Sequence, residues 1–389
     1  MEDLKGTAIA GAALCELKTD QALAASIRTS TTGINTQRRP AVSHAFPPCS
    51  TSQLPHRKVR ADNQDMSQST LIAVVIPSYR VKRHILDVIR GIPSLVGRIY
   101  VVDDACPDGS GKYVEDNCID PRVSIHYNEH NAGVGGAVLR GYAEAIADGA
   151  TIIVKVDGDG QMDPALIPDF IAPIQRREAD YTKGNRFFDL AAIRQMPPVR
   201  IIGNAALSFM TKISSGYWDL FDPTNGFTAI HADVARRLPV DRISRRYFFE
   251  SDVLFRLNTL RAVVVDVPMD ARYGDEVSNL HIGHIIGDFF SKHLRNGFKR
   301  IFYNYFLRDL SLASLELVAG TALMIVGTVI GAYHWWASVH TGIETTAGTV
   351  MLAALPLILG LQFVLGFLSY DIASVPRKPI QRQNDFNGL

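Results

Sequence analysis

The segment from Val154 to Pro164, VKVDGDGQMDP, places two carboxylates on either side of one glycine, directly after a run of apolar residues. In an extended segment residues i and i+2 point to the same side, so Asp157 and Asp159 can face one spot beyond a strand end. The intervening Gly158 lets a ligand approach the backbone. Carboxylate oxygens suit Mg²⁺ or Mn²⁺, and such an ion would neutralise the two acids and bridge to the phosphates of a substrate.

Two nearby polar residues extend this motif. Gln161 continues the spacing as a neutral oxygen ligand or hydrogen-bond partner. Asp163 stands before Pro164 and an apolar helical pattern, which is typical of an N-cap followed by proline at the first helical position. A D-x-D motif is a weak signal by itself, and the alternative interpretation of the pair is an acidic turn.

The elements that must position these acids alternate from Leu71 to about Val156. Four β-branched runs predict strands: LIAVVIP, GRIYVVDD, RVSIHYN and ATIIVKVD. Helical patterns separate them, from about Lys82, over Gly111–Asn117 and over Gly133–Asp148. Continuous apolar strands between helices favour an α/β fold with a parallel sheet covered on both faces. Ligands bind at the carboxyl ends of such strands, and three of these predicted ends are polar: Pro77, Ser78 and Tyr79; Asp103 and Asp104; Asp157 and Asp159.

Composition limits the function classes. The chain has 389 residues, 47% of them apolar, and a formal net charge of +1, so bulk charge gives no reason to expect nucleic-acid binding. Its four cysteines have no C-x-x-C spacing, which excludes a recognisable zinc motif or disulfide framework and suits a reducing compartment. Residues 1–70 are rich in Ser, Thr, Ala, Gln and Pro, so we predict a disordered leader and hypothesise that Met66 is the natural start.

Two long segments near the C-terminus are free of Asp, Glu, Lys and Arg: Leu317–Ile343 and Thr345–Tyr370. About 20 helical residues cross a hydrocarbon core, so residues 311–370 predict two transmembrane helices that form a hairpin. The YHWW sequence at Tyr333–Trp336 is typical of an aromatic belt. Two buried helices of a soluble domain are the alternative.

The charges that flank this hairpin predict its orientation. The connecting loop has no Lys or Arg. Five basic residues precede the hairpin: Lys292, Arg295, Lys299, Arg300 and Arg308. Three follow it: Arg377, Lys378 and Arg382. The positive-inside rule then places the large domain and the tail, residues 371–389, in the cytoplasm, at the inner (cytoplasmic) membrane of a multi-pass protein. Residues 281–310 interleave aromatics with basic residues, which predicts a juxtamembrane amphipathic segment that attracts anionic lipid; a domain-packing helix is the alternative.

Six motifs in order resemble the family 2 glycosyltransferases, in particular the branch of dolichyl-phosphate mannose synthase and bacterial polyprenyl-phosphate glycosyltransferases: VVIPSYR, VVDDACPDGSG, NAGVGGAVLRGY, KVDGDGQMDP, KGNRF and DPTNGF. The resemblance covers about Leu71 to Leu280. It implies a GT-A catalytic domain over residues 71–280, a Rossmann-like, mostly parallel sheet with the nucleotide of a sugar donor over the strand ends.

The resemblance also implies roles for residues of the donor site. Pro77 and Tyr79 would border the base, and Asp103 or Asp104 would accept a hydrogen bond from base or ribose. From the residues alone, the two Asp equally well start a turn and cap the next helix. The metal ligands would be Asp157, Asp159 and Gln161. The segment from Asn131 to Ala137 would open a helix at Gly133, whose N–H groups could meet phosphate or sugar oxygens.

Further implied roles concern phosphate, sugar and acceptor. Arg186 would pair with donor phosphate, and Arg272 resembles a basic residue of a phosphate-binding segment. Asp222 and Asn225 would line the sugar and acceptor pocket, with turn formation as the alternative. An acid at Glu250 or Asp252 would lie near the acceptor, and the sequence leaves open which. The implied catalytic set is Asp159, Asp222, Glu250 and Asp252.

The implied reaction is an inverting, metal-dependent transfer from a nucleotide sugar to a polyprenyl phosphate, in contact with membrane lipid and without nucleic acid. The sequence leaves a homo-oligomer open. The enzymatic alternative, a processive polysaccharide synthase, lacks support because no Q-x-x-R-W motif is present. A membrane-tethered, catalytically inactive binding protein for nucleotide sugar or lipid is an alternative of another class. Two positions depart from the family: Arg80, Val81 and Lys82 replace an acid after the first strand, and Asn279 replaces a lysine.

Overall fold

The computed structural model describes residues 70–188, 198–270 and 282–382. The predicted leader, apart from Thr70, and the hypothesised start at Met66 lie outside the described residues.

The first half of the catalytic domain confirms the predicted alternation of strands and helices. Four mutually parallel strands are β1 (Ile72–Ser78), β2 (Arg98–Asp103), β3 (Val123–Tyr127) and β4 (Ile152–Lys155). The helices between them are α2 (Ile85–Gly91), α3 (Ser110–Asn117) and α4 (Val134–Ala147). The predicted N-cap is also confirmed, because Asp163 accepts a hydrogen bond from the Ala165 backbone N–H at the start of η1 (Pro164–Leu166).

The second half of the domain completes a seven-stranded sheet with the order β3-β2-β1-β4-β6-β5-β7. The added strands are β5 (Tyr181–Asn185), β6 (Thr228–His231) and β7 (Val264–Pro268). Their helices are α5 (Ile167–Gln175), α7 (Pro198–Ser215), α8 (Ala232–Arg237), η2 (Val240–Arg242) and α9 (Phe249–Leu260). Strand β6 runs antiparallel to β4 and β5, so the loop that precedes it reaches the edge where β4 ends.

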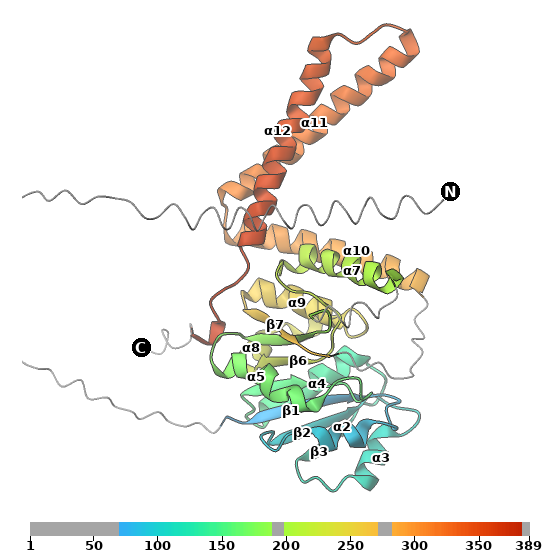
Figure 1. The fold of residues 1–389 in the computed structure, drawn as a ribbon, viewed down its shortest axis with the longest axis vertical. Helices are drawn as coiled ribbons and strands as arrows, with labels where there is room; N and C mark the ends of the chain where they lie inside the picture. Colours follow the sequence, from blue (N-terminus) through green and yellow to red (C-terminus); the bar gives the residue numbers. More distant parts are fainter. Residues whose placement is uncertain (1–69, 189–197, 271–281, 383–389) are drawn as a thin grey trace, which may run out of the picture. The chain divides into compact units, whose positions relative to one another are not determined.

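Alternate residues of β1 face two separate apolar cores. Ala73 and Val75 pack on one face of the sheet with residues of α4 and α9. Ile72, Val74 and Ile76 pack on the other face with residues of α2 and α5. The period of two in a strand therefore buries both faces of β1, which explains its unbroken apolar sequence. Figure 1 shows the helices on the two sides of the sheet.

Three long helices follow the sheet: α10 (Ile282–Phe302), α11 (Leu312–Thr341) and α12 (Ala347–Ala373), with the π-helix η3 (Tyr303–Arg308) after α10. Among the described residues, α11 and α12 are the two helices long and apolar enough to cross a membrane. Only 11% and 17% of their most apolar windows are buried, so they are not core helices of a soluble domain. These surfaces indicate association with a membrane.

Small residues let α11 and α12 pack closely. A Cβ atom added at Gly320 would lie 2.8 Å from the carbonyl oxygen of Gly360, and one added at Gly327 would lie 2.8 Å from that of Ala353. Such small residues at a helix contact are typical of membrane helices, where close backbone packing replaces the hydrophobic effect.

Helix α10 lies beside α7 and α9 and is joined to the catalytic domain by buried polar contacts (Figure 1). The His293 Nδ1 atom lies 2.8 Å from the Ser214 hydroxyl, and burial lowers the pKa of His293 from 6.5 to about 4. The Asn296 side chain of α10 donates to the carboxylate of Asp252 in α9 at 3.0 Å. This face of α10 is therefore part of the domain.

Candidate active site

Residues from three strand ends line one cleft of about 580 Å³, a volume typical of small-molecule sites. Pro77, Ser78 and Tyr79 come from the end of β1, and Asp104 follows β2. The turn after β4 contributes Asp157, Gly158 and Asp159 to the same cleft. The loop before α4 contributes Asn131 and Gly133, and the loop before α9 contributes Arg246 and Tyr247. The structure thus brings together most of the expected donor-site residues.

The turn after β4 presents the acidic pair to this cleft. Asp159 accepts a hydrogen bond from the Gln161 backbone N–H at 2.9 Å, which closes the turn. A Cβ added at Gly158 would lie 3.0 Å from a methyl carbon of Val81, so a larger residue there would press on the β1–α2 loop. The side chain of Gln161 is not among the groups that line the cleft.

The acidic pair supplies two of the ligands that a divalent cation needs, and water or substrate phosphates would complete the site. Within the described part of the chain, no three His, Cys, Asp or Glu side chains cluster as a complete metal site. The Oδ1 atom of Asp157 is buried and lies 3.0 Å from the Lys155 ammonium group, so a cation at this carboxylate would share it with Lys155. A Mg²⁺ or Mn²⁺ site with one or two carboxylates is typical where substrate phosphates and water supply the other ligands.

A lysine that we did not single out from the sequence stands between two acids. The Nζ atom of Lys155 lies 3.0 Å from Oδ1 of Asp157 and 3.1 Å from Oε1 of Glu250, and Lys155 is only 1% exposed. Burial by itself lowers the pKa of Lys155, but the two carboxylates outweigh it and raise this pKa above its ordinary value. Burial raises the pKa of Glu250, and the charge of Asp157 raises it further while Lys155 lowers it. A lysine inside an apolar strand was the signal in the sequence.

A second cavity of about 760 Å³ adjoins the first and is largely apolar. Lys155, Asp157 and Glu250 line it, together with Leu207 and Met210 of α7 and Phe289 of α10. Asp157 and Tyr247 line both cavities. Asp157 therefore lies where a polar cleft meets a largely apolar cavity that residues of α7 and α10 help to line.

The structure separates the two acids of α9. Glu250 lines the apolar cavity. Asp252 instead accepts hydrogen bonds from the Ser244 backbone N–H at 2.8 Å and from the Asn296 side chain of α10 at 3.0 Å. The two residues are two positions apart on a helix and face different directions. Asp252, which we included in the implied catalytic set, thus anchors α10 in this structure.

The two acids after β2 hold loops together. Asp103 accepts hydrogen bonds from the Cys106 and Gly111 backbone N–H groups, at 2.7 and 2.6 Å, and is buried away from the cleft. Asp104 lines the cleft, and its carboxylate accepts from the backbone N–H groups of Ala132 and Gly133, both at 2.8 Å. The geometry of Asp103 matches the turn-and-cap alternative.

The N-terminus of α4 differs from our expectation. The Gly135 backbone N–H donates to the carbonyl oxygen of Arg245 at 2.9 Å, and Gly136 donates to the same oxygen at 3.4 Å. The backbone N–H groups of Ala132 and Gly133 donate to Asp104. The N–H groups that we expected to meet phosphate or sugar therefore already donate hydrogen bonds within the protein. Gly133 has a φ of 81° and packs against Arg245, so glycine is required there for both conformation and space.

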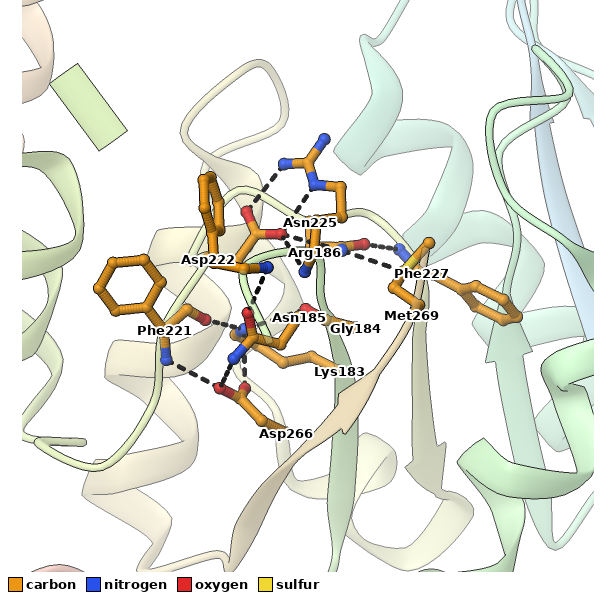
Figure 2. A network of polar contacts seen from close by, with 11 residues as sticks. Lys183, Gly184, Asn185, Arg186, Phe221, Asp222, Asn225, Phe227, Asp266 and Met269 are labelled. Carbon is orange, nitrogen blue, oxygen red and sulfur yellow. Dashed lines mark hydrogen bonds and ion pairs between the residues drawn. The ribbon is translucent and has the colours of Figure 1, made fainter. Parts of the chain in front are cut away.

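Arg186 and Asp222 form a bidentate ion pair, shown in Figure 2. The Nε and Nη2 atoms of Arg186 donate to the two oxygens of Asp222 at 2.7 and 2.8 Å. Burial alone raises the pKa of Asp222, but the hydrogen bonds and charge of Arg186 lower it below its ordinary value. Asn225 donates to Asp222 at 3.1 Å and accepts from the Phe227 backbone N–H at 3.0 Å.

These contacts place three predicted site residues in a loop-holding network. Asp222 and Asn225 are each 2% exposed and are not among the groups that line the two cavities. Their neighbours Thr224 and Gly226 do line the apolar cavity. The turn-forming alternative for Asp222 and Asn225 therefore agrees with the geometry, because their hydrogen bonds hold the loop that presents these neighbours.

A second buried ion pair, between Lys183 and Asp266, also holds this loop, as Figure 2 shows. Lys183 lies 2.9 Å from Oδ1 of Asp266 and donates to the carbonyl oxygen of Phe221. Asp266 accepts from the Phe221 backbone N–H at 2.8 Å. Burial raises the pKa of Asp266, and Lys183 opposes this change. The remaining predicted site residue, Arg272, lies outside the described residues.

Comparison with known proteins places the chain in a family. Residues 73–238 match the model of the family described as Glycosyl transferase family 2. An undecaprenyl-phosphate mannosyltransferase of Micrococcus luteus is 30% identical over 51% of this chain and 82% of its own length. A UDP-N-acetylglucosamine–dolichyl-phosphate N-acetylglucosaminyltransferase of Methanococcus voltae is 28% identical over 52% of this chain and 86% of its own length.

A solved structure also resembles the chain. Glucosyl-3-phosphoglycerate synthase from Mycobacterium tuberculosis, in complex with Mn²⁺, UDP and glucosyl-3-phosphoglycerate, aligns with a TM-score of 0.46 at 17% identity. The alignment covers 60% of this chain and 81% of that chain. The chain belongs to glycosyltransferase family 2 and is a glycosyltransferase.

Proposed function

We propose that the protein transfers a sugar from a nucleotide sugar to a polyprenyl phosphate at the cytoplasmic face of the membrane, with inversion at the anomeric carbon. The observation that carries this proposal is that Asp157 lines both the polar cleft and the apolar cavity. A charged donor and a lipid-linked acceptor need these two environments side by side. The relatives named for undecaprenyl and dolichyl phosphate support this acceptor class.

In the proposed reaction, an oxygen of the acceptor phosphate attacks the anomeric carbon while the bond from that carbon to the diphosphate breaks. The electron pair of the broken bond leaves with the nucleoside diphosphate. Asp157 and Asp159 would hold a divalent cation, which would supply charge stabilisation for this leaving group. The second pKa of a phosphate monoester is about 6, so the acceptor needs no strong general base at neutral pH. Glu250 then orients the acceptor.

The outer face of α10 supports delivery of the acceptor from a bilayer. Four apolar side chains at intervals of four residues are 51–67% exposed on this helix: Phe290, Leu294, Phe298, Phe302. The opposite face carries the buried His293, Asn296 and Arg300. A helix that is anchored on one face and apolar on the other can lie in the headgroup plane, and its basic residues attract anionic lipid.

The orientation follows from charge and topology. Both ends of the hairpin join described parts of the catalytic domain, through η3 and through the tail after α12. With Lys and Arg on this side and none in the connecting loop, the positive-inside rule places the cleft in the cytoplasm.

The test is a transfer assay with purified full-length protein in detergent. A panel of nucleotide sugars is incubated with Mn²⁺ or Mg²⁺ and a short polyprenyl phosphate, and glycolipid is measured by mass. We expect one donor to give a sugar–phosphate–polyprenol with inverted anomeric configuration by NMR, and we expect EDTA to suppress it. Polymer formation would favour a processive synthase, and binding of donor without any product would favour an inactive binding protein.

A further inference from the structure

Lys155 is paired with two acids, of which Asp157 lines both cavities and Glu250 lines only the apolar cavity. The distances from its Nζ atom to Asp157 and Glu250 are nearly equal, 3.0 and 3.1 Å. Asp157 follows β4 and reaches the polar cleft, whereas Glu250 comes from α9 and lines only the apolar one of the two cavities. With Lys155 protonated, and both acids ionised, this group has a net charge of −1.

The loop before β6 packs tightly on this group. A Cβ added at Gly226 would lie 2.3 Å from Oδ2 of Asp157 and 2.5 Å from Nζ of Lys155. Glycine at this position lets the backbone cover the ammonium group of Lys155, whose side chain is only 2% exposed. Charges interact more strongly where water is excluded, so removing the charge of one member changes the electrostatic energy of the others.

We propose that Lys155 is a positioning residue that sets the affinity of Asp157 for a divalent cation, by dividing its charge between Asp157 and Glu250. This inference rests on the proposed metal site at Asp157 and Asp159. The ammonium group holds the Asp157 carboxylate in place and also opposes a cation next to it. Glu250 weakens that opposition because its negative charge partly cancels the repulsion between the ammonium group and the cation.

The proposal predicts opposite effects of two single substitutions. Lys155→Met keeps the approximate length of the side chain but removes its charge, so Asp157 and Glu250 attract a cation more strongly. Glu250→Gln removes one acid, so the whole charge of Lys155 opposes the cation. The double variant restores the net charge of −1. A role of Lys155 in folding alone would instead weaken binding in each variant or change none of them.

The experiment is a titration of full-length protein in detergent with Mn²⁺ alone, followed by electron paramagnetic resonance of free Mn²⁺. We expect the dissociation constant to fall about three- to tenfold in Lys155→Met and to rise about three- to tenfold in Glu250→Gln, with the double variant near the wild type. Lys155→Arg, which keeps the charge, should lie within about twofold of the wild type. Lys112→Met removes an ion-paired lysine on the surface of α3, away from both cavities, and should leave the Mn²⁺ affinity unchanged.

Two negative results can be told apart. If the wild type and an Asp157→Asn variant bind Mn²⁺ equally weakly, the metal site of the proposed function fails and this inference fails with it. If Asp157→Asn abolishes Mn²⁺ binding but Lys155→Met and Glu250→Gln change it in the same direction or not at all, only the role of Lys155 is overturned. Should Lys155→Met not fold, as judged by circular dichroism, the rise expected for Glu250→Gln still tests the proposal.

Discussion

Arg300 of α10 and Asp371 of α12 form a buried ion pair with an N–O distance of 2.5 Å. Their side chains are 2% and 3% exposed. The Trp218 indole N–H and the Tyr305 hydroxyl also donate to Asp371, and Arg300 donates to the carbonyl oxygen of Ile213. Helix α12 is thereby joined to α10 and to the loop after α7 that contains Trp218.

Removing one partner of this pair should destabilise the protein strongly. Asp371→Ala leaves the guanidinium of Arg300 buried without its counter-ion, which costs about 3–5 kcal/mol in comparable sites. We expect a lower midpoint of thermal unfolding in detergent. The control is Asp87→Ala, because the Arg90–Asp87 pair is more than 70% exposed and its loss should change stability by less than about 1 kcal/mol. Equal midpoints for both variants would contradict the prediction.

The tail after α12 should contribute to the stability of the catalytic domain. The backbone N–H of Ile380 donates to the buried carboxylate of Asp180 at 2.9 and 3.0 Å, and the Ile380 side chain is 3% exposed within the core. Ile380→Ala should cost about 2–4 kcal/mol because it leaves a cavity there. Ile119→Ala is the control, since Ile119 is 98% exposed. Chemical unfolding monitored by fluorescence measures both, and comparable stability would refute docking of the tail.

Acid should weaken the contact between α10 and the catalytic domain. Burial lowers the pKa of His293 from 6.5 to about 4. Between these pH values the unfolded chain binds a proton that the folded chain does not, so stability falls as the pH drops through this interval. The loss approaches about 3 kcal/mol at pH 4, at about 1.4 kcal/mol per pH unit. His293→Gln should show a smaller change of unfolding midpoint between pH 6.5 and pH 4 than the wild type; an equal change would exclude His293 as the source.

Loss of a carboxylate in the acidic turn should stop transfer without unfolding the protein. Asp159→Asn removes charge stabilisation of the leaving diphosphate, which lowers the rate about 10²–10³-fold at comparable sites. The matched control is Asp163→Asn, four residues further along, where the amide oxygen can still cap η1. Product formation per minute at saturating donor measures the effect. Wild-type turnover in Asp159→Asn would exclude a metal role for this residue.

Charge reversal on α10 should weaken use of the lipid acceptor. Arg295 and Lys299 flank the exposed apolar stripe of α10, so glutamate at both positions should repel anionic lipid and acceptor phosphate. We expect the KM for polyprenyl phosphate in anionic vesicles to rise several-fold while the KM for the donor stays unchanged. Lys112→Glu, on the exposed part of α3, is the control. An unchanged acceptor KM would favour a helix that only packs on the domain.

Local patterns in the sequence were sufficient for much of this architecture. The alternation of apolar strands and helices from β1 to β4, the acidic turn after β4, the N-cap at Asp163 and the two apolar helices all depend on neighbouring residues. A strand alternates its sides every two residues, a cap acts within one turn, and a membrane helix needs only length and apolarity. Such features can be predicted without knowing what lies across the fold.

Pairings between distant segments were decided by the tertiary structure alone. Lys155 meets Glu250 across 95 positions, and Arg186 turns to Asp222 across 36. Because β6 is antiparallel to β4, the loop before β6 brings Gly226 onto Lys155. The orientation of α9 directs Asp252 to α10 and Glu250 to the apolar cavity. The energy of a buried charge depends on which opposite charge and which dipoles surround it. Those neighbours come from packing of the whole domain, so the residue types could name the acids and bases of the site but not their partners.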